Sequence, residues 1–471
     1  MTTSTGGTWP AEALRHAEPS VFWLDDPAAP EPLPPLEGAT RTDLLVVGGG
    51  YAGLWTALRA KQRDPSRDVV LIEAETCGHA ASGRNGGFCA ASLTHGFGNG
   101  LARWPEEMPT LERLGMENLE GIAETVERYG IDCHFERTGE LAVATEPYQL
   151  PELAEAFAAM KEAGADVELL DAEGTRALVN SPTYRGAIWD RTGCAMVEPG
   201  HLAWGLRRAC LEEGVRLHEH TPALELNRHG QSVRVRTRTG SVTARRIALA
   251  TNAYPSLLRR NRLMTVPVYD YVLMSEPLTA EQRQAVGWTG RQGVGDSANQ
   301  FHYYRLTRDD RILWGGYDAV YYYGSGLGPS LEQRQATFER LSEHFFATFP
   351  QLEGVRFTHR WGGAIDTCTR FSAFFGTALD GQVVYAAGFT GLGVGATRFA
   401  ADVMLDLADS LQTPRTQLEM VRRRPMPFPP EPLRYGAIQL TRWSLDRADR
   451  HAGRRNLWLR ALDRLGLGFD S

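Results

Sequence analysis

A glycine-rich loop between an apolar strand and a helix constrains the fold of this chain most strongly. Residues 43–47 (DLLVV) suit a strand that is buried on both faces, and they lead directly into residues 48–53 (GGGYAG). The segment beyond the loop has apolar residues at helical spacing and no helix breaker. In such a loop Gly48 permits a tight turn, Gly50 lets the backbone approach a diphosphate, and Gly53 lets the helix pack on the sheet. The pattern predicts a βαβ unit that binds a dinucleotide.

An acidic residue follows the second strand of this βαβ unit, at the position where dinucleotide-binding units use one to bind a ribose. Glu73 follows the second apolar run (VVLI) and lies twenty residues beyond Gly53, with Ala74 after it. A carboxylate at this position accepts hydrogen bonds from both ribose hydroxyls of an adenosine and repels a 2′-phosphate. The helix start at Tyr51 and Ala52 would offer free backbone N–H groups to the diphosphate. These residues do not distinguish NAD from FAD.

Two later loops are also rich in small residues that would let backbone atoms approach a cofactor. Residues 77–87 (CGHAASGRNGG) gather small residues around one arginine and one asparagine, which suits contact with a diphosphate or with the edge of a flat ring. Residues 382–389 (QVVYAAGF) predict a buried strand that runs into a glycine-rich turn and a second helix start near Gly391. A helix N-terminus stabilises negative charge, and a flavin ring acquires such charge when it is reduced. The second loop therefore favours FAD over NAD.

Four short segments, in order, resemble the D-amino acid oxidase superfamily of FAD-dependent oxidoreductases, in the branch that contains gamma-glutamylputrescine oxidase. They are SGRNGG (82–87), EPG (198–200), ATNA (250–253) and GFTGLG (388–393), and the resemblance spans roughly residues 40–412. Together with the glycine loop, it implies that FAD is bound by Gly48, Gly50, Tyr51, Ala52, Gly53, Glu73, Ala74, Ser82, Arg84, Asn85, Gly86, Gly87, Thr251, Asn252, Gly388, Thr390, Gly391, Leu392, Gly393 and Val394.

The resemblance also implies a reaction. In this family a hydride equivalent passes from the carbon that bears an amine to the flavin, and water hydrolyses the resulting imine to a carbonyl product. The substrate class is a small amine or amino acid. The alternatives are a D-amino acid dehydrogenase, a glycine or sarcosine oxidase-like enzyme, an NAD-dependent dehydrogenase, and a flavin-bound accessory protein without redox activity.

Aromatic strands after residue 265 supply the candidates for the substrate pocket. A desolvating aromatic pocket keeps an amine neutral and ready for hydride transfer. Trp361 begins a WGG strand that resembles the family strand passing close to the flavin. We predict catalytic roles for Tyr271, His302, Tyr304 and Trp361, and substrate contacts from Tyr269 and Arg305, whose guanidinium could anchor a carboxylate or phosphonate.

Cysteine and lysine usage bear on the flavin chemistry. Related sarcosine oxidases hold flavin through a cysteine in the region of Cys368, but Cys368 lies about two residues from the matching position, so noncovalent FAD is expected. The same enzymes use a lysine to promote reaction with oxygen, and its place falls near Trp314. The chain has lysine only at Lys61 and Lys161. The electron acceptor, oxygen or another molecule, stays open.

Length and pattern predict an α/β architecture with an α+β second domain. The 471 residues exceed what one core usually organises. We expect a Rossmann-type FAD-binding domain built from separated segments and a substrate domain with a mixed or antiparallel sheet. The expected bounds are 1–40 for an N-terminal arm, 41–98, 195–265 and 355–412 for the FAD-binding domain, 99–194 and 266–354 for the substrate domain, and 413–471 for a C-terminal connector and amphipathic tail.

Composition limits the partners. The net charge of -7, with arginine and acidic residues interleaved, argues against a nucleic-acid partner. Six scattered cysteines lack the spacing of a metal site, so no metal is expected. No apolar stretch reaches membrane-spanning length, and the N-terminus does not read as a signal peptide, so a cytoplasmic location is expected. The expected partners are a small-molecule amine and an electron acceptor, and the oligomeric state stays open.

Overall fold

The computed structural model describes residues 9–467, and within them the strands form two large sheets and one small one. The first large sheet runs β18-β19-β11-β1-β2-β8, with β10 and β9 continuing from β11. Its central pairs are parallel, and β18, β10 and β9 join antiparallel. The strands are β1 (Gly38–Val47), β2 (Val69–Ile72), β8 (Arg216–His218), β9 (Glu225–His229), β10 (Ser232–Arg236), β11 (Gly240–Leu249), β18 (Phe374–Ala378) and β19 (Val383–Ala387).

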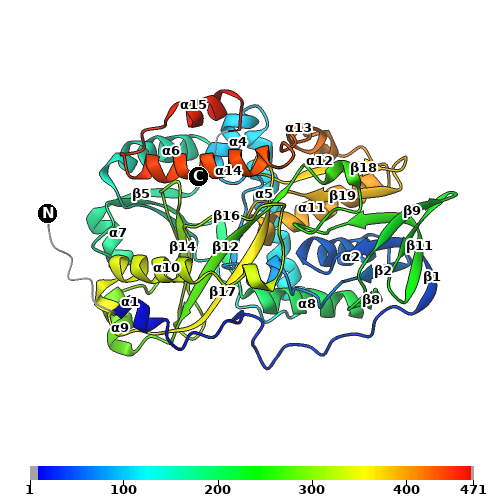
Figure 1. Cartoon of the computed structure of the whole chain (residues 1–471), viewed down its shortest axis with the longest axis horizontal. Coiled ribbons are helices and arrows are strands. Elements are labelled where there is room, and N and C mark those ends of the chain that lie inside the picture. Colours follow the sequence, from blue (N-terminus) through cyan, green and yellow to red (C-terminus); the bar gives the residue numbers. More distant parts are fainter. Residues whose placement is uncertain (1–8, 468–471) are drawn as a thin grey trace.

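The first sheet is drawn from three separated stretches of the chain, which confirms the predicted dinucleotide-binding architecture. Its central strands are buried because helices cover them, and in Figure 1 this part fills the right-hand half of the molecule. The helices that pack near β1 and around the loop after it are α2 (Tyr51–Arg63), α3 (Ala81–Arg84), α5 (Met108–Arg128), α8 (Pro199–Glu212) and α11 (Gly393–Ala408).

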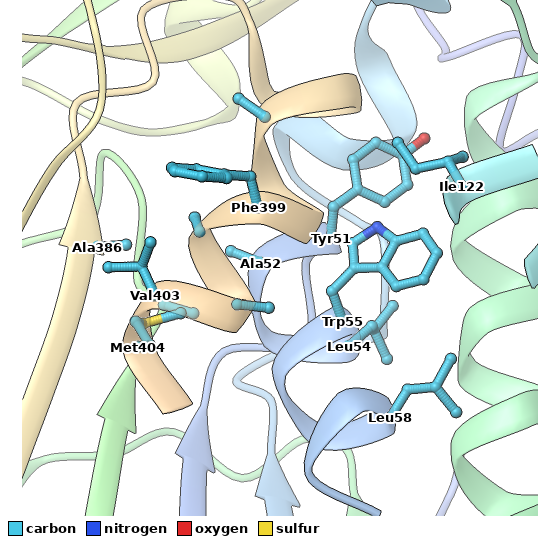
Figure 2. Packing of buried hydrophobic residues seen from close by; sticks show 14 of the residues in the cluster. Tyr51, Ala52, Leu54, Trp55, Leu58, Ile122, Ala386, Phe399, Val403 and Met404 are labelled. Atoms are coloured by element: carbon cyan, nitrogen blue, oxygen red, sulfur yellow. The ribbon is translucent and has the colours of Figure 1, made fainter. Parts of the chain in front are cut away.

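Apolar packing joins three of these helices. Tyr51 and Trp55 of α2 meet Ile122 of α5 on one side, while Phe399 and Val403 of α11 lie on the other (Figure 2). Trp55 and Ile122 are fully buried. Burial of large side chains is the main favourable term in such packing, and each contributes about 2 kcal/mol. The core therefore fixes α2 and α11 as neighbours.

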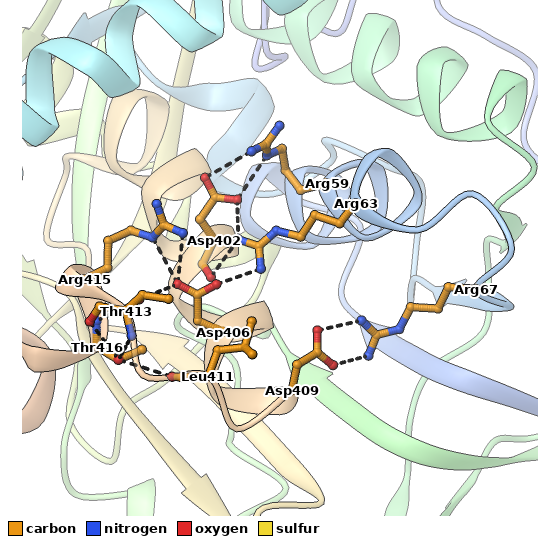
Figure 3. Close-up of polar contacts among 10 residues, drawn as sticks. All are labelled: Arg59, Arg63, Arg67, Asp402, Asp406, Asp409, Leu411, Thr413, Arg415 and Thr416. Carbon is orange, nitrogen blue, oxygen red and sulfur yellow. Dashed lines mark hydrogen bonds and ion pairs between the residues drawn. The ribbon is translucent and has the colours of Figure 1, made fainter.

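Ion pairs between α2 and α11 reinforce that packing. Arg59 and Arg63 both contact the carboxylate of Asp402, at 3.0 and 2.8 Å, and Arg63 reaches Asp406 at 2.7 Å (Figure 3). Arg415 completes the group with a 2.9 Å contact to Asp406. Burial alone would raise the pKa of Asp402, but the arginines outweigh it and the pKa is lowered. These ion pairs therefore tie α2 to α11 beyond their first turns.

The second large sheet is mixed, as predicted, and runs β16-β12-β15-β14-β13-β4-β6-β5 with β17 on β12. The β13–β4 pair is parallel and the other pairs are antiparallel. Its strands are β4 (Glu140–Ala144), β5 (Val167–Asp171), β6 (Gly186–Asp190), β12 (Val266–Ser275), β13 (Gly293–Asp296), β14 (His302–Leu306), β15 (Ile312–Gly316), β16 (Val320–Tyr321) and β17 (Phe357–Thr367).

Two of the expected domain bounds differ from the packing in the structure. The first is at α5, which was expected in the substrate domain but packs against α2 and α11 in the core beside the first sheet. The second concerns residues 355–412, which were assigned to the FAD-binding domain, whereas β17 pairs with β12 along nearly its whole length, from Phe357 to Thr367. This strand therefore belongs to the second sheet. After β11 the chain returns to the first sheet only at β18, because the WGG strand (β17) pairs with β12 of the second sheet.

The remaining elements surround the second sheet or cap the molecule. A small sheet of β3 (Phe88–Ala90) and β7 (Cys194–Met196) lies between the two large ones in the chain order. The other helices are α1 (Trp9–Ala13), α4 (Phe97–Arg103), α6 (Leu150–Glu162), α7 (Ala172–Leu178), α9 (Ala280–Val286), α10 (Gln335–Thr348), α12 (Pro414–Gln417), α13 (Glu419–Arg422), α14 (Leu433–Asp449) and α15 (Leu457–Arg464), with short 3-10 turns at Pro147–Gln149, Arg259–Asn261, Pro329–Leu331 and Pro350–Leu352.

Both ends of the described chain pack onto the body. The predicted N-terminal arm carries α1, which contacts α10, and its Trp23 is buried. At the other end α14 and α15 lie along the upper edge of the molecule in Figure 1. Within residues 9–467, no helix is both long enough and apolar enough to cross a membrane.

Candidate cofactor and substrate site

A cavity of about 2890 Å³ opens between the two large sheets. Pockets for drug-sized ligands commonly measure about 300–1,000 Å³, so this one has room for a large cofactor and a substrate together. Seventeen of the twenty residues predicted to bind cofactor line it. The other three lie behind the wall. Gly53 and Gly87 let neighbouring backbone approach closely, and Gly388 leaves room for the side chains of Cys368 and Phe374.

The glycine loop has the geometry that its sequence predicts. Gly48 has φ +110°, and a Cβ there would lie 2.4 Å from the carbonyl oxygen of Ala250. A Cβ on Gly53 would lie 1.8 Å from the carbonyl oxygen of Gly48, so any side chain there would push α2 away from the loop. Tyr51 lines the cavity, while its ring packs into the core and its hydroxyl donates to the Pro199 carbonyl oxygen at 2.9 Å.

Glu73 sits at the end of β2 beside this loop. Its carboxylate accepts the N–H of Gly49 at 2.5 Å and the N–H of Glu75 at 2.9 Å. Burial raises the pKa of Glu73, and the backbone hydrogen bonds oppose that rise. The side chain is thus fixed on the cavity wall at the end of β2. A carboxylate at this place can accept hydrogen bonds from the hydroxyl groups of a ribose.

The loop at residues 82–87 is braced by its own asparagine, by the N-terminal arm and by β17 of the second sheet. Asn85 Nδ2 donates to the carbonyl oxygens of Ala81 and Ser82 at 2.9 and 3.0 Å, and its Oδ1 accepts the N–H of Gly87 at 2.8 Å. Asn85 is therefore a loop-shaping residue as well as a lining residue. Two indoles hold the loop from outside, because Trp23 donates to the Asn85 carbonyl oxygen and Trp361 donates to that of Arg84, both at 2.9 Å.

Arg84 lies between this loop and the second sheet. Its guanidinium contacts the Glu332 carboxylate at 2.5 Å and donates to the Gly362 carbonyl oxygen at 3.2 Å. Its Nε donates to the carbonyl oxygen of His79 at 2.9 Å. The side chain is only 10% exposed, so these contacts hold a positive charge in place at the seam between the two sheets.

The late loop, residues 388–394, is held by a carboxylate that the sequence analysis missed. Asp366, which is 1% exposed, accepts the N–H of Gly388 at 2.5 Å and the N–H of Phe389 at 3.1 Å. Burial raises the pKa of Asp366 to about 7, against the opposing effect of these donors. The loop also contains Thr390 at φ +50°, a left-handed conformation that is unfavourable for a β-branched residue.

Two helix N-termini face the cavity. The N-cap positions of α2 and α11 are Gly50 and Leu392, and neither provides a side-chain cap. The Tyr51 N–H donates to Ser82 Oγ at 2.9 Å, and the other N–H groups of the first turns, with the positive ends of both dipoles, are left for the cavity. A diphosphate and a ring that becomes anionic on reduction are the groups that such ends stabilise. Together with Glu73 and the close-approach glycines, these donors fit FAD.

Cys368 lies on the cavity boundary, but its thiol is directed to backbone oxygens. Its Sγ donates to the carbonyl oxygen of Ser372 at 3.2 Å and to that of Gly388 at 3.5 Å. Burial raises the pKa of this thiol. A thiol is nucleophilic as its thiolate, so these surroundings keep Cys368 unreactive.

The wall formed by the second sheet contains a carboxylate and a phenol in direct contact. Asp270 of β12 and Tyr303 of β14 both line the cavity, and the Tyr303 hydroxyl donates to Asp270 Oδ2. The backbone N–H of Tyr271 donates to Asp270 Oδ1 at 2.8 Å. Burial raises the pKa of Asp270 to about 6, although both donors act to lower it. Tyr269, a predicted substrate contact, lines the cavity beside them.

Four predicted catalytic residues do not line the cavity. Trp361 braces the loop described above, and the Tyr271 hydroxyl donates to the Leu331 carbonyl oxygen at 2.7 Å. The hydroxyls of Tyr304 and Tyr184 lie 2.6 Å apart inside the second sheet's core. His302 stands behind the wall, where its Nδ1 lies 2.7 Å from Asp296.

Arg305, the predicted anchor for a substrate carboxylate, is fully buried and does not line the cavity. Its Nε donates to the carbonyl oxygen of Leu306 at 3.1 Å, and its Nη1 donates to that of Val197 at 2.5 Å. Burial lowers the pKa of Arg305 to about 10. The guanidinium therefore binds backbone carbonyl oxygens next to β14 and does not face the cavity. Gly87 and Val197 cover it at this end of the strand.

Neither lysine reaches the cavity. Lys61 Nζ donates to the carbonyl oxygens of Pro65 and Arg67 at the end of α2, and Lys161 lies on α6 near the Val167 carbonyl oxygen. Trp314 is buried among aromatic rings of the second sheet. The described cavity wall therefore offers no ammonium group for reaction with oxygen.

Comparison with known families matches the site geometry. The family model described as FAD dependent oxidoreductase (DAO) covers residues 43–407. This chain belongs to that family. It is an FAD-dependent oxidoreductase, and the matched region includes both glycine-rich loops that line the cavity.

Individual relatives of this DAO-family chain cover most of its length. It is 34% identical to gamma-glutamylputrescine oxidoreductase of Escherichia coli strain K12 over 418 residues, which are 86% of this chain and 89% of that protein. Among solved structures, glycine oxidase from Geobacillus kaustophilus matches with a TM-score of 0.66 at 19% identity, over 80% of this chain and 96% of that one. L-proline dehydrogenase from P. horikoshii matches with a TM-score of 0.67 at 18% identity, over 82% and 96%. At these identities the solved structures support the fold alone.

Proposed function

We propose that this enzyme oxidises the carbon–nitrogen bond of a small amine or amino acid. The C–H bond next to nitrogen breaks, its electron pair leaves as hydride, and the nitrogen lone pair forms the C=N bond of an imine. Water then hydrolyses the imine to a carbonyl compound and a free amine. FAD, when bound, supplies the two-electron acceptor for this step. The observation that carries the proposal is the Asp270–Tyr303 pair on the wall opposite the glycine loops.

The same residues support noncovalent FAD. The α2 N-terminus would receive the diphosphate, Glu73 the ribose hydroxyls, and the α11 N-terminus the ring edge that becomes anionic. The Arg84–Asn85 loop would lie against the ring, held there by Trp23 of the N-terminal arm and Trp361 of β17. The Cys368 thiol is bonded to backbone oxygens and carries a raised pKa, which disfavours a covalent link.

Asp270 gives the cavity a means of handling the substrate proton. An ammonium group cannot release hydride until its nitrogen has lost a proton, because the lone pair must form the new bond. With its pKa raised to about 6, Asp270 is a stronger base than an ordinary aspartate and is largely ionised at neutral pH. We propose that an Asp270 carboxylate oxygen accepts this proton and that the Tyr303 hydroxyl, which donates to Oδ2, holds the carboxylate in position.

The test is anaerobic reduction of the flavin by candidate substrates. Purified protein is expected to carry FAD and to lose its visible flavin absorbance when mixed, without oxygen, with the right compound. The panel comprises gamma-glutamyl amines, polyamines, D-amino acids, N-methyl amino acids and aminophosphonates. Absence of bound flavin would overturn the cofactor assignment, and bleaching by 2-hydroxy acids but by no amine would overturn the substrate class.

The same panel separates the closest alternatives. Preferential bleaching by a D-amino acid would favour a D-amino acid dehydrogenase, and bleaching by glycine or sarcosine would favour a glycine or sarcosine oxidase-like enzyme. Reoxidation is then followed with oxygen and with a soluble quinone. Because neither lysine lines the cavity, we expect reoxidation by oxygen to be slow compared with reoxidation by the quinone.

A further inference from the structure

The C-terminal tail, residues 414–471, differs in charge from the rest of the molecule. It contains twelve arginines and six acidic residues, a side-chain charge of +6, whereas the whole chain carries -7. Several of these arginines point outward without an acidic partner, because among the described residues Arg454, Arg460 and Arg464 form no ion pair. A basic tail on an acidic body is a signal of interaction with an anionic surface.

The outer face of α14 combines these charges with exposed apolar side chains. Leu433, Leu440 and Trp443 recur at helical spacing and are 68%, 41% and 54% exposed. Arg447 and Arg450 continue the same stripe, and the Arg447 guanidinium lies 5.8 Å from the centre of the Trp443 ring. The opposite face of this helix packs on the body. Leucine, tryptophan and arginine therefore share one unpartnered face.

The outer face of α15 repeats this composition. Leu457 is 78% exposed, and Arg460 and Arg464 follow it at helical spacing. Leu459, in contrast, is 1% exposed and faces inward. The two helices are joined by a 2.9 Å hydrogen bond from Trp458 Nε1 to Thr441 Oγ1 and a second from Asn456 to Ser444, and both lie along the same edge of the molecule (Figure 1).

This pattern fits a lipid surface better than a protein partner. Protein interfaces gather their apolar residues in a centre depleted of charge. Here the apolar side chains alternate with arginines along two helices, as in helices that lie in the plane of a bilayer, where leucine and tryptophan enter the headgroup region and arginines reach anionic phosphates. We propose that the outer faces of α14 and α15 dock on the surface of an anionic lipid bilayer.

The net negative charge of the body does not oppose this docking at moderate salt. Charges separated by more than about 10 Å are largely screened at 0.1 M ionic strength, so the local arginine-rich face decides the attraction. The inner sides of the same helices line the cavity, through residues such as Ile438, Leu445 and Trp458. Docking would therefore place the tail-covered side of the cavity against the membrane.

The test is cosedimentation of the full-length protein with vesicles. Vesicles of phosphatidylglycerol with phosphatidylcholine are compared with vesicles of phosphatidylcholine alone. We expect the partition coefficient on the anionic vesicles to be at least about 100-fold higher, because each arginine near such a surface adds to the binding. High salt should reduce this preference, because it shortens the screening length to about 3 Å at 1 M.

Two sets of substitutions separate the charge from the apolar anchors. Arg454→Glu with Arg460→Glu and Arg464→Glu should remove the preference for anionic vesicles. Leu440→Ser with Trp443→Ser and Leu457→Ser should lower binding to anionic vesicles at least about tenfold, because exposed apolar anchors are lost. None of these six side chains lines the cavity, so flavin content and turnover of dissolved substrate should be unchanged.

A matched control lies at the far end of the first sheet. Leu224→Ser with Arg234→Glu and Arg238→Glu makes the same kinds of change on another exposed surface, near the β9–β10 hairpin, and should leave vesicle binding unaltered. Light scattering is run on every variant.

Three outcomes would overturn the proposal. They are equal binding to neutral and anionic vesicles, tail variants that bind as well as wild type, and no vesicle binding by wild type or variants together with an oligomeric state that the tail substitutions change. The last would identify a second copy of the chain as the occupant of this face.

Discussion

The two walls of the cavity were predicted with very different success, and the contrast follows from what builds each wall. The first wall consists of glycine loops and two helix N-termini, where backbone atoms form the surface. The second consists of side chains on β12, β14 and β17, where one strand face lines the cavity and the other enters the core. Most predicted residues of the first wall line the cavity, while of the predicted substrate-side residues Tyr269 does and Tyr304 and Arg305 do not.

Gly53→Ala should disrupt the glycine loop of the first wall and so reduce flavin binding. A Cβ at this position would lie 1.8 Å from the carbonyl oxygen of Gly48, so the start of α2 must move away from the loop that it closes. We expect the purified variant to contain less than about a tenth of the wild-type flavin, because the backbone N–H groups and the positive end of the helix dipole no longer point toward the diphosphate. Flavin content per chain, from absorbance after denaturation, measures this.

Gly436→Ala is the control for that change. Gly436 is also helical, but a Cβ there would meet nothing within 4 Å. The variant should keep full flavin content. Retention of flavin by Gly53→Ala would mean that the loop does not have the tight geometry described here.

Comparison of Tyr303→Phe with Tyr304→Phe tests which tyrosine of the second wall takes part in the reaction. Tyr303 lines the cavity and donates to Asp270, whereas the Tyr304 hydroxyl lies next to that of Tyr184 in the core. Loss of a hydrogen bond to a charged group lowers kcat/KM by about tenfold for Tyr303→Phe. Tyr304→Phe should leave kcat/KM within about twofold, since its hydroxyl is remote from the reacting atoms. The reverse ranking would return Tyr304 to the catalytic site.

Asp366 predicts a pH dependence of stability in the first wall. Its pKa is about 7 in the folded protein and lower in the unfolded chain, so the folded state binds the proton more tightly. Stability from this group is therefore greatest at low pH and falls as pH rises through about 7. Asp366→Asn should flatten the decline in Tm between about pH 5 and pH 8, whereas the exposed Asp380→Asn should not. Scanning calorimetry gives both slopes, and equal slopes in wild type and Asp366→Asn would refute the assignment.

Arg305→Met should have the smallest effect on catalysis. The Arg305 guanidinium is buried and bonded to the Val197 and Leu306 carbonyl oxygens, so it does not reach a substrate. We expect KM for an amino-acid substrate to stay within about twofold, because no substrate contact is lost. Steady-state kinetics on folded protein, checked by circular dichroism, provides the measurement. A rise in KM of about tenfold or more would restore its role as a carboxylate anchor.

The sequence was informative where function depends on the backbone. Gly48, Gly50 and the loop at Gly391 carry a local signal, because few other residues permit those turns and close approaches. The position of Glu73 on the cavity wall followed for the same reason, since it is fixed by distance along one βαβ unit. The separated strands of the first sheet were also predicted, because each is a short apolar run followed by a helix.

The second wall depended on information that sequence does not carry. Alternate residues of β14 face opposite ways, and nothing local tells whether Tyr303 or Tyr304 meets the cavity. Asp366 acts on the N–H groups of residues 388 and 389, about twenty positions away. Trp23 braces Asn85 across sixty-two positions. Such roles emerge only when the two sheets are brought together.

Anaerobic flavin reduction in Asp270→Asn is the decisive measurement, because it follows hydride transfer alone, without the later reaction with an electron acceptor. Asparagine keeps the size of the side chain but cannot accept the substrate proton. We expect the variant to retain FAD while the rate of flavin reduction falls about 100-fold. We also expect the wild-type rate to decline as pH drops below about 6, where Asp270 becomes protonated. A variant that reduces its flavin at the wild-type rate, with the same pH profile, would contradict the account.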